Sequence, residues 1–483
     1  MRVAPESNAV SDEFRGYACD PGWSTEEFGG VEFQDARLQK RFLVVSAQLA
    51  AQPQASINQA CEDWASTKGA YRLFENPKVE PARILAPHQQ RTCARMLGQT
   101  RILALQDTCY VNYTSHPATQ GLGLIGADQD GQVGLIMHST LAMTAEGLPL
   151  GLLTQTIWAR PEADPEDDAA ARRGQRRQRP VEAKESGKWL KAVRETQAVC
   201  PAGLEVVHLC DREADFYELF QEVYDLGAQM VVRASQDRAV MEGGQIRQVL
   251  SQRPVSGSLT VEIPAQQGRA ARTATVEVRY GEVTLRPPYR SPACQVTFCP
   301  LQVWGVGVRE VDPPAEVEAP LGWLLLTNVP VTSFLDAAER VRWYRLRWQI
   351  EVFHRVLKSG CTVEECRLDQ AEELKRYLTL KSVIAWRLYW MVQIARVQPE
   401  AACTIVLADH EWQALYVAIH RTSHLPETIP TVRQVVRWIA QLGGFLGRTS
   451  DGEPGVTVIW RGWQRLHDVA TMWLVLHGTP DGK

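Results

Sequence analysis

Three acidic residues occupy positions from which their carboxylates could act on one substrate. Asp107 follows the apolar run 102–105, Asp211 directly follows the apolar run LEVVHLC, and Glu351 lies in the segment 343–360. Carboxylate oxygens suit Mg²⁺, which binds one or two carboxylates together with waters and phosphate oxygens. Two such ions can stabilise the attacking and leaving oxygens of an in-line phosphoryl displacement. The three acids therefore predict a phosphoryl-transfer site of the nuclease or strand-transferase kind.

The segment 343–360, WYRLRWQIEVFHRVLKSG, has the periodicity of a helix with two different faces. At 100° per residue, Arg347, Glu351 and Lys358 fall in an arc about 60° wide beside Tyr344. The neighbouring arc is apolar, with a spacing of three and four residues that is typical of a buried face. The polar face therefore presents a carboxylate between two cations.

Each acid also has a purely structural interpretation. Asp is favoured at helix N-caps, so Asp211 could cap a helix that begins at Arg212, and Asp107 could open a turn. Glu351 could form i,i+4 ion pairs, each contributing a few tenths of a kcal/mol. Ion pairs of this kind do not require a tyrosine on the same helical face, so the presence of Tyr344 on that face favours a shared site.

Helical patterns at both ends of the chain flank a central region of a different type. Residues 22–85 predict an all-helical domain after a polar extension, residues 1–21, and residues 399–483 predict a second helical domain. Over 86–398, strands alternate with helices, which predicts an α/β domain with a mixed sheet flanked by helices. A period of two over about 236–322 predicts a β-rich insertion, which fills the long gap before the last of the three acids.

The overall charge argues against a protein that grips nucleic acid with its whole surface. The 483 residues carry 52 Lys and Arg against 56 Asp and Glu, a formal net charge of −4, whereas DNA-binding proteins usually have a basic surface. Residues 171–194, however, hold nine basic residues against two acidic ones, and the first 85 hold nine against twelve. Because phosphate binding depends on local cations, we expect the basic stretch from Arg172 and the Glu351 helix to border a DNA path, and the N-terminal domain to rely on a few placed residues.

Several other classes of protein are excluded. No apolar run approaches the roughly 18 residues that span a bilayer, and the first residues lack the apolar core of a signal peptide, so we expect a cytoplasmic protein.

Eleven cysteines without paired spacing predict reduced thiols, and His354, Cys361 and Cys366 fit no common zinc pattern. GLGLIG (121–126) lacks the strand-turn-helix setting of a dinucleotide site, and KESGKW lacks the rest of a P-loop, so no nucleotide is expected.

A series of motifs resembles a known family. The pattern Tyr344-x2-Arg347-x3-Glu351-x6-Lys358 is similar to the signature of DDE transposases of the insertion-sequence-four group. Other motifs of that family recur in the same order from about Trp23 to His477. They are GAYRLFENP (69–77), QDT (106–108), KESGKWL (184–190), CDREAD (210–215), VVR (231–233), WLLLT (323–327) and GGF (443–445). One short signature can arise by chance, whereas an ordered series is specific.

The resemblance implies an RNase H-like catalytic core that contains the β-rich insertion. It implies that Asp107, Asp211 and Glu351 form a metal-binding catalytic triad for two Mg²⁺ ions, with Mn²⁺ as a substitute. The reaction would be cut-and-paste DNA transposition. Water cleaves one strand at the transposon end, the freed 3′-OH attacks the opposite strand to form a hairpin, water reopens the hairpin, and the 3′-OH joins target DNA.

The resemblance also implies residues that contact the DNA: Tyr344, Arg347, Lys358, Trp348, Arg233 and Trp323. The first three would hold phosphates of the hairpinned strand, and Trp348 would line the same pocket. Trp323, 21 residues before Tyr344, matches the family's stacking tryptophan. From its own position, at the edge of an apolar strand, Trp323 fits a core residue equally well.

The partners implied are the terminal inverted repeats of a transposon, target DNA and a second copy of the chain. The N-terminal domain would bind the repeats, and the C-terminal helices would pair two subunits in a homodimer on the bacterial nucleoid. Residues 1–21 have no counterpart in the family. Two alternatives are a DNA-binding protein that does not cut and a metal-dependent nuclease that cannot join strands. The three acids argue against the first, and Trp323 with Tyr344 and Arg347 argues against the second.

Overall fold

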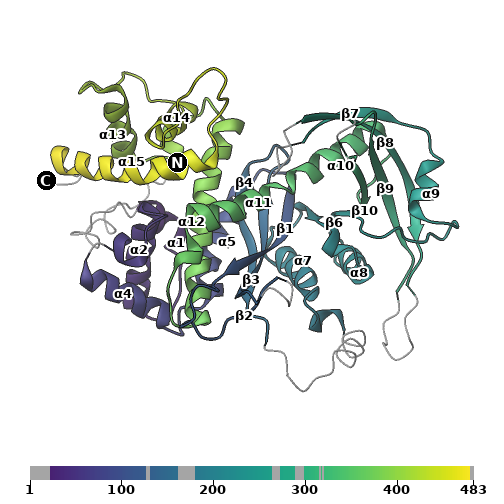
Figure 1. Ribbon diagram of the computed structural model, residues 1–483, viewed down its shortest axis with the longest axis horizontal. Helices are drawn as coiled ribbons and strands as arrows, with labels where there is room; N and C mark the ends of the chain where they lie inside the picture. The colour runs from purple at the N-terminus through teal and green to yellow at the C-terminus, as the bar shows by residue number, and fades with distance from the viewer. Residues whose placement is uncertain are drawn as a thin grey trace, which may run out of the picture.

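The computed structural model describes residues 22–478 apart from 62, 127–130, 162–179, 264–271, 289–297, 315–316 and 318–319. The extension 1–21 and the basic stretch that begins at Arg172 therefore fall largely or wholly outside the described residues. In the described part, no helix is both long and apolar enough to cross a membrane. Figure 1 shows an α/β arrangement in which helices cover a long twisted sheet, as the alternation of strands and helices predicted.

A mixed ten-stranded sheet runs through the molecule in the order β2 (Gly123–Leu124), then β3-β1-β5-β6-β10-β9-β8-β7, with β4 also paired to β3. Its central strands β1 (Arg101–Asn112), β5 (Glu205–Cys210) and β6 (Gln229–Arg233) are parallel. Strands β3 (Val133–Met143) and β4 (Pro149–Trp158) continue the sheet antiparallel on one side. The middle of β1 is fully buried, as expected for a parallel strand covered on both faces.

The predicted β-rich insertion is a continuation of this sheet. Strands β7 (Gly257–Ile263), β8 (Arg272–Leu285) and β9 (Leu301–Glu310) are antiparallel to one another. Strand β10 (Gly322–Thr327) then pairs with β9 on one side and with β6 of the core on the other. Buried and exposed residues alternate along much of β8, which is why its sequence showed a period of two.

Helices cover the two faces of the sheet. Helix α7 (Gly187–Val199) lies with α8 (Tyr217–Asp225) beside the parallel strands in Figure 1. Helix α12 (Ala371–Val397) is the central helix, and 20 of its 27 residues are buried. A helix that is buried all round must have neighbours on every side. Accordingly α12 contacts α5, β4 and helices from both ends of the chain.

The first and last segments that the structure describes are helical, as their periodicity predicted. The first group is α1 (Gly22–Phe28), α2 (Ala36–Ala51), α3 (Ile57–Ala60), α4 (Trp64–Glu75) and α5 (Pro81–Met96). The last group is α13 (Asp409–His420), α14 (Val432–Leu442) and α15 (Val456–His477). Asp35 and Asp63 cap α2 and α4 by accepting hydrogen bonds from backbone amides, so the short polar segments before these helices fix where they begin.

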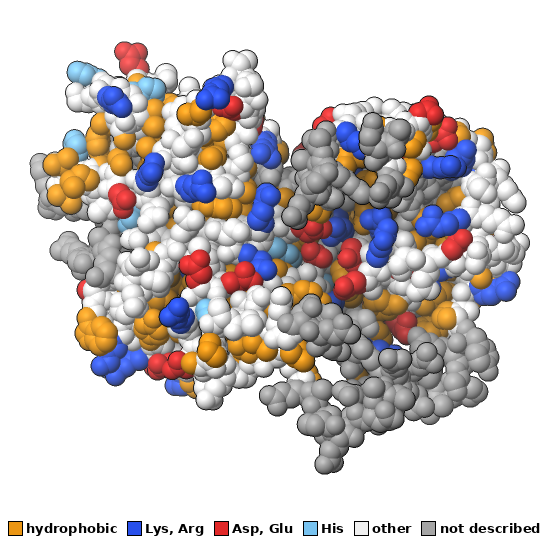
Figure 2. Space-filling model, viewed as in Figure 1, with side chains coloured by type: hydrophobic (Ala, Val, Ile, Leu, Met, Phe, Trp, Pro, Cys, Tyr) orange, Lys and Arg blue, Asp and Glu red, His pale blue; other side chains and the backbone are white. Residues whose placement is uncertain are grey.

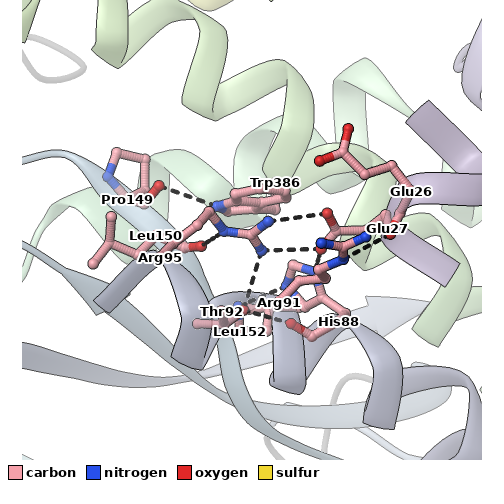
Figure 3. A network of polar contacts seen from close by, with 10 residues as sticks. All are labelled: Glu26, Glu27, His88, Arg91, Thr92, Arg95, Pro149, Leu150, Leu152 and Trp386. Carbon is pink, nitrogen blue, oxygen red and sulfur yellow. Dashed lines mark hydrogen bonds and ion pairs between the residues drawn. The ribbon is translucent and has the colours of Figure 1, made fainter. Parts of the chain in front are cut away.

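A buried ion pair fastens the first helix to the core (Figure 3). Arg95 of α5 donates from Nη1 and Nη2 to Glu27 of α1 at 3.0 and 2.9 Å, and its Nε donates to the Leu150 carbonyl of β4 at 2.6 Å. His88 binds Glu27 through Nδ1, while its Nε2 accepts the Leu152 amide at 2.8 Å. Because Nε2 is an acceptor, His88 is neutral, and burial lowers its pKa.

Two predicted element boundaries differ from the structure. Strand β1 does not end before Asp107 but continues to Asn112, because β3 pairs with it over that whole length. The helix expected over 343–360 begins earlier, as α10 (Phe334–Leu346), because Ser333 and Asp336 form a capping box. It then continues as α11 (Gln349–Arg355) and a π-helical turn (Val356–Gly360).

Candidate active site and DNA-binding surface

The two aspartates lie at the same level of neighbouring parallel strands. β1 and β5 pair with a constant offset, from Arg101 opposite Glu205 to Leu105 opposite Leu209. Continued by two residues, this register sets Asp107 opposite Asp211. The carboxyl ends of parallel strands form one edge of a sheet, where binding sites usually lie. Burial raises the pKa of Asp211, and the negative charge of Asp107 raises it further.

Asp211 also has the structural role that its sequence position suggested. Its side chain caps a 3₁₀ turn, Arg212–Ala214, by accepting the Glu213 amide at 2.8 Å. The predicted helix from Arg212 is in fact this turn, and α8 begins only at Tyr217. One carboxylate oxygen is used in the cap, so the cap orients the side chain and the other oxygen is left for a ligand.

Helix α11 brings Glu351 to this edge of the sheet, and Arg347 lies between two of the acids. Arg347 Nη2 is 2.5 Å from Glu351 Oε1, and its Nη1 is 3.9 Å from Asp107 Oδ1. The Arg347 side chain is only 13% exposed. Burial raises the pKa of Glu351, although Arg347 opposes this shift. The polar face predicted from helical spacing is therefore present, and it faces β1.

His354 is a site residue that the sequence interpretation did not identify. Its Nδ1 lies 3.7 Å from Asp107 Oδ2, and the side chain is 7% exposed. Burial alone would raise the pKa of Asp107, but contact with His354 and the charge of Arg347 lower it below its usual value. The spacing held a signal, because on the same helical projection His354 falls at about 280°, beside Arg347 at about 300°.

The donor set is oxygen-rich and suits a hard cation such as Mg²⁺. Within the described ranges, however, no three His, Cys, Asp or Glu side chains converge closely enough to hold a metal as they stand. The Arg347 side chain contacts Glu351 and faces Asp107. The fit to a divalent metal therefore rests on the chemistry of the carboxylate donors and not on their present distances.

Most of the predicted DNA-contacting residues surround these acids. The ring centroids of Trp323 and Tyr344 are 5.6 Å apart in an edge-to-face arrangement. Burial lowers the pKa of Arg233, while interaction with the Tyr344 hydroxyl raises it. Trp348 is 44% exposed, which is high for so large an apolar side chain. Trp323, Tyr344 and Arg233 therefore form one group beside Arg347, and Trp348 follows Arg347 directly in the chain.

Lys358 has a different immediate partner. Its Nζ is 2.9 Å from Glu364 Oε1, which also accepts the Asn112 amide at the end of β1 at 2.8 Å. The structure thus places Lys358 beside the last residues of β1, with Glu364 as a neighbour that helical spacing could not reveal. Figure 2 shows acidic side chains gathered in the middle of this face, with Lys and Arg side chains on the strands beside them.

A buried polar network on the opposite face of β1 fixes this strand. Gln106 bonds His208 Nδ1 at 2.9 Å, and its Oε1 is 3.4 Å from His138 Nε2. Thr108 bonds His138 Nδ1 at 3.0 Å. Burial lowers the pKa of both histidines to about 3, so they are neutral at pH 7. Residues 106 and 108 thus tie β1 to β3 and β5, while Asp107 between them points to the other face.

A second basic surface lies on the N-terminal helices. Arg37 and Arg41 of α2 and Lys68 and Arg72 of α4 line an open groove whose one acidic residue is Asp35. Arg41 lies across Gly69, where an added Cβ would be 1.5 Å from its Nη1, so this glycine makes room for the guanidinium. The N-terminal region therefore contains a local cluster of cations, although its acidic residues outnumber its basic ones.

Two family models match the chain, one near each end. The family described as Transposase DNA-binding matches residues 20–79, which include α1 to α4. The family described as Transposase Tn5 dimerisation domain matches residues 383–472, from α12 into α15. Together the two matches support a protein of the transposase class, which implies a DNA-processing enzyme. They support a Tn5-like transposase, which confirms the family resemblance indicated by the motif series, and they support DNA binding and homodimer formation.

Proposed function

We propose that this chain catalyses cut-and-paste DNA transposition in an RNase H-like core, with Asp107, Asp211 and Glu351 as its metal-binding triad. The observation that carries the proposal is that β1, the end of β5 and α11 bring these acids to one edge of the sheet, where Arg347 contacts Glu351 and faces Asp107. Two bound Mg²⁺ ions, or Mn²⁺ in their place, would neutralise charge on the phosphate and activate the attacking oxygen.

The remaining site residues would hold DNA. Arg347, Arg233 and Lys358 offer guanidinium and ammonium donors to phosphate oxygens, and positioning with charge neutralisation contributes most of phosphoryl-transfer catalysis. Tyr344 would hold the same strand through its hydroxyl. Each step breaks one P–O bond and forms another to the oxygen of the attacking water or 3′-OH, while the displaced oxygen leaves as a hydroxyl. Hydrolysis therefore gives a phosphomonoester, hairpin formation and joining give new phosphodiesters, and none of the steps needs an oxidant or a further group donor.

Hairpin formation at a blunt end requires a base to leave the stack. Aromatic side chains stabilise such a base by about 1 to 3 kcal/mol through stacking. Trp323 packs edge-to-face against Tyr344, and Trp348 is exposed four residues after Tyr344 in the chain. A nuclease that only hydrolyses DNA would not need these rings, which favours the transposase over a simple nuclease.

The proposal is tested with DNA that carries the element's own ends. Terminal inverted repeats flanking the gene supply that sequence. Purified protein, Mg²⁺ and labelled end DNA should give nicked ends, then hairpins, then joined products. Binding without any cleavage would indicate a DNA-binding protein and would contradict the proposal. Nicks that never become hairpins or joined strands would instead indicate a nuclease.

The basic groove on α2 and α4 should hold phosphates of the transposon end. Changing Arg41 and Arg72 together to Ala should weaken end binding at moderate salt and lower the slope of log affinity against log salt by about 1.8, or about 0.9 for each phosphate that is no longer neutralised. The measurement is fluorescence anisotropy over a salt series. Arg247→Ala, an exposed cation on α9 (Ile246–Ser251), is the matched control. An unchanged slope in the double variant would place the DNA elsewhere.

The last turns of α15 should contribute to the dimer. Met472, Val475 and Leu476 are 58%, 75% and 71% exposed and lie on one helical face, and clustered exposed apolar residues usually mark a protein contact. Val475→Glu with Leu476→Glu should lower the yield of paired-end complexes by about tenfold or more, since burying a charge is unfavourable, while single ends still bind. Gel-shift assays with two end lengths measure this. Leu97→Glu, also 72% exposed, is the control, and equal loss in both variants would contradict the assignment.

A further inference from the structure

Arg347 is the charged partner of two proposed metal-binding acids. Its guanidinium contacts Glu351 through Nη2 at 2.5 Å and faces Asp107 through Nη1 at 3.9 Å. Among the described residues, Nη1 is a buried donor that lacks a hydrogen-bond partner. A buried cation between two carboxylates lowers their negative potential where a metal would bind. Any divalent ion must compete with it for the same oxygens.

The other cations proposed to bind DNA are arranged differently. Lys358 is paired with Glu364, and Arg233 faces Tyr344. Arg347 is also the residue at which α10 ends, one turn before Glu351, so it belongs to the junction of two helices rather than to the middle of one. Its planar guanidinium can bind a phosphate through two parallel hydrogen bonds, which makes DNA a strong competitor for it.

We propose that Arg347 is an internal counter-ion that keeps Asp107 and Glu351 from binding metal until a DNA phosphate draws its guanidinium away. This inference rests on the proposed function, because it takes the three acids to be the metal site. DNA binding then raises metal affinity, and by thermodynamic linkage metal binding raises DNA affinity by the same factor. The protein without DNA would bind metal weakly at this site, so the reactive site would be complete only on its substrate.

The test measures Mn²⁺ binding to the full chain, as wild type and as an Arg347 variant, each with and without end DNA, which gives a thermodynamic cycle. The electron paramagnetic resonance signal of free Mn²⁺ reports how much of the metal is bound. Only binding that is lost in Asp107→Asn is counted. Without DNA, Arg347→Gln should bind Mn²⁺ about tenfold more tightly than the wild type, within the usual range of coupling between sites. End DNA should raise the Mn²⁺ affinity of the wild type by a larger factor than that of the variant, and the ratio of the two factors should match the gain seen without DNA.

The controls separate this inference from the proposed function. Arg345→Ala removes an exposed cation from the same helix and should leave Mn²⁺ binding at the wild-type level. Arg347→Ala is a second variant in case the glutamine variant does not fold. If either folded variant binds Mn²⁺ no more tightly than the wild type, or if DNA raises affinity equally in both proteins, the counter-ion role is wrong. If Asp107→Asn removes no Mn²⁺ binding, the proposed metal site itself is wrong.

Discussion

Replacing Asp107 with asparagine is expected to lower strand cleavage by about a thousandfold or more while DNA binding persists. Asparagine keeps the shape of the side chain and one oxygen but removes the negative charge. Metal-assisted charge stabilisation contributes several kcal/mol to such reactions, and each 1.36 kcal/mol corresponds to a factor of ten in rate. Single-turnover cleavage of labelled end DNA measures the loss, and a gel shift on the same DNA measures binding.

The matched control is Asp225→Asn. Asp225 is an exposed residue at the end of α8, where it accepts a hydrogen bond from Gln221 at 2.9 Å. The Asp225→Asn variant should cleave DNA at the wild-type rate, because it makes the same chemical change as Asp107→Asn at a position away from the site. Cleavage by Asp107→Asn within a few-fold of the wild type would remove Asp107 from the proposed triad, whatever its effect on binding.

The second large effect is expected at Glu27, far from the reacting atoms. Glu27→Gln should lower the free energy of unfolding by about 3 kcal/mol, since removing one partner of a buried ion pair leaves the other charge uncompensated. Arg95 would keep its hydrogen bond to the Leu150 carbonyl and its position 4.3 Å from the centroid of the Trp386 ring, but it would lose the carboxylate of Glu27 as its ion-pair partner. Urea unfolding, followed by circular dichroism, measures the change. In Figure 3 these residues join α1, α5, β4 and α12.

The same network gives a pH dependence with a defined sign. Burial would raise the pKa of Glu27, but contacts with His88 and Arg95 outweigh it and lower the pKa from 4.5 to about 2. Its stabilising contribution is therefore complete above about pH 4.5 and is lost as the pH falls toward 2. The pKa of His88 is lowered as well, so protonation below its ordinary pKa of 6.5 acts in the same direction. Wild-type stability should fall in acid more steeply than that of Glu27→Gln.

Glu26→Gln is the control for both measurements. Glu26 is exposed, and its backbone carbonyl accepts Arg91 Nε at 2.8 Å while its carboxylate points away from the network in Figure 3. Its substitution should leave the free energy of unfolding and its acid dependence unchanged. Equal stability of Glu26→Gln and Glu27→Gln would show that the buried pair does not stabilise the junction between α1 and the core.

Helical spacing was informative because it depends only on backbone geometry. The positions of Arg347 and Glu351 on one face followed from 100° per residue, and the same arithmetic would have included His354. It remained valid although α10 and α11 are separate elements, since the backbone at Arg347 and Trp348 stays helical. The position of Asp107 within β1 could not be predicted, because the strand is prolonged by pairing with β3, whose residues come about 30 positions later.

By itself, the sequence determined the class of each region, the candidate residues and the family to which the protein is similar. These features are local periodicities and ordered motifs, and each residue contributes to them through its own backbone preferences. The tertiary structure decided how they meet. It set the register that brings Asp107 opposite Asp211, the insertion of Arg347 between Asp107 and Glu351, and the attachment of α1 through Glu27. Such contacts join residues far apart in the chain and depend on the packing of whole elements, which no local pattern encodes.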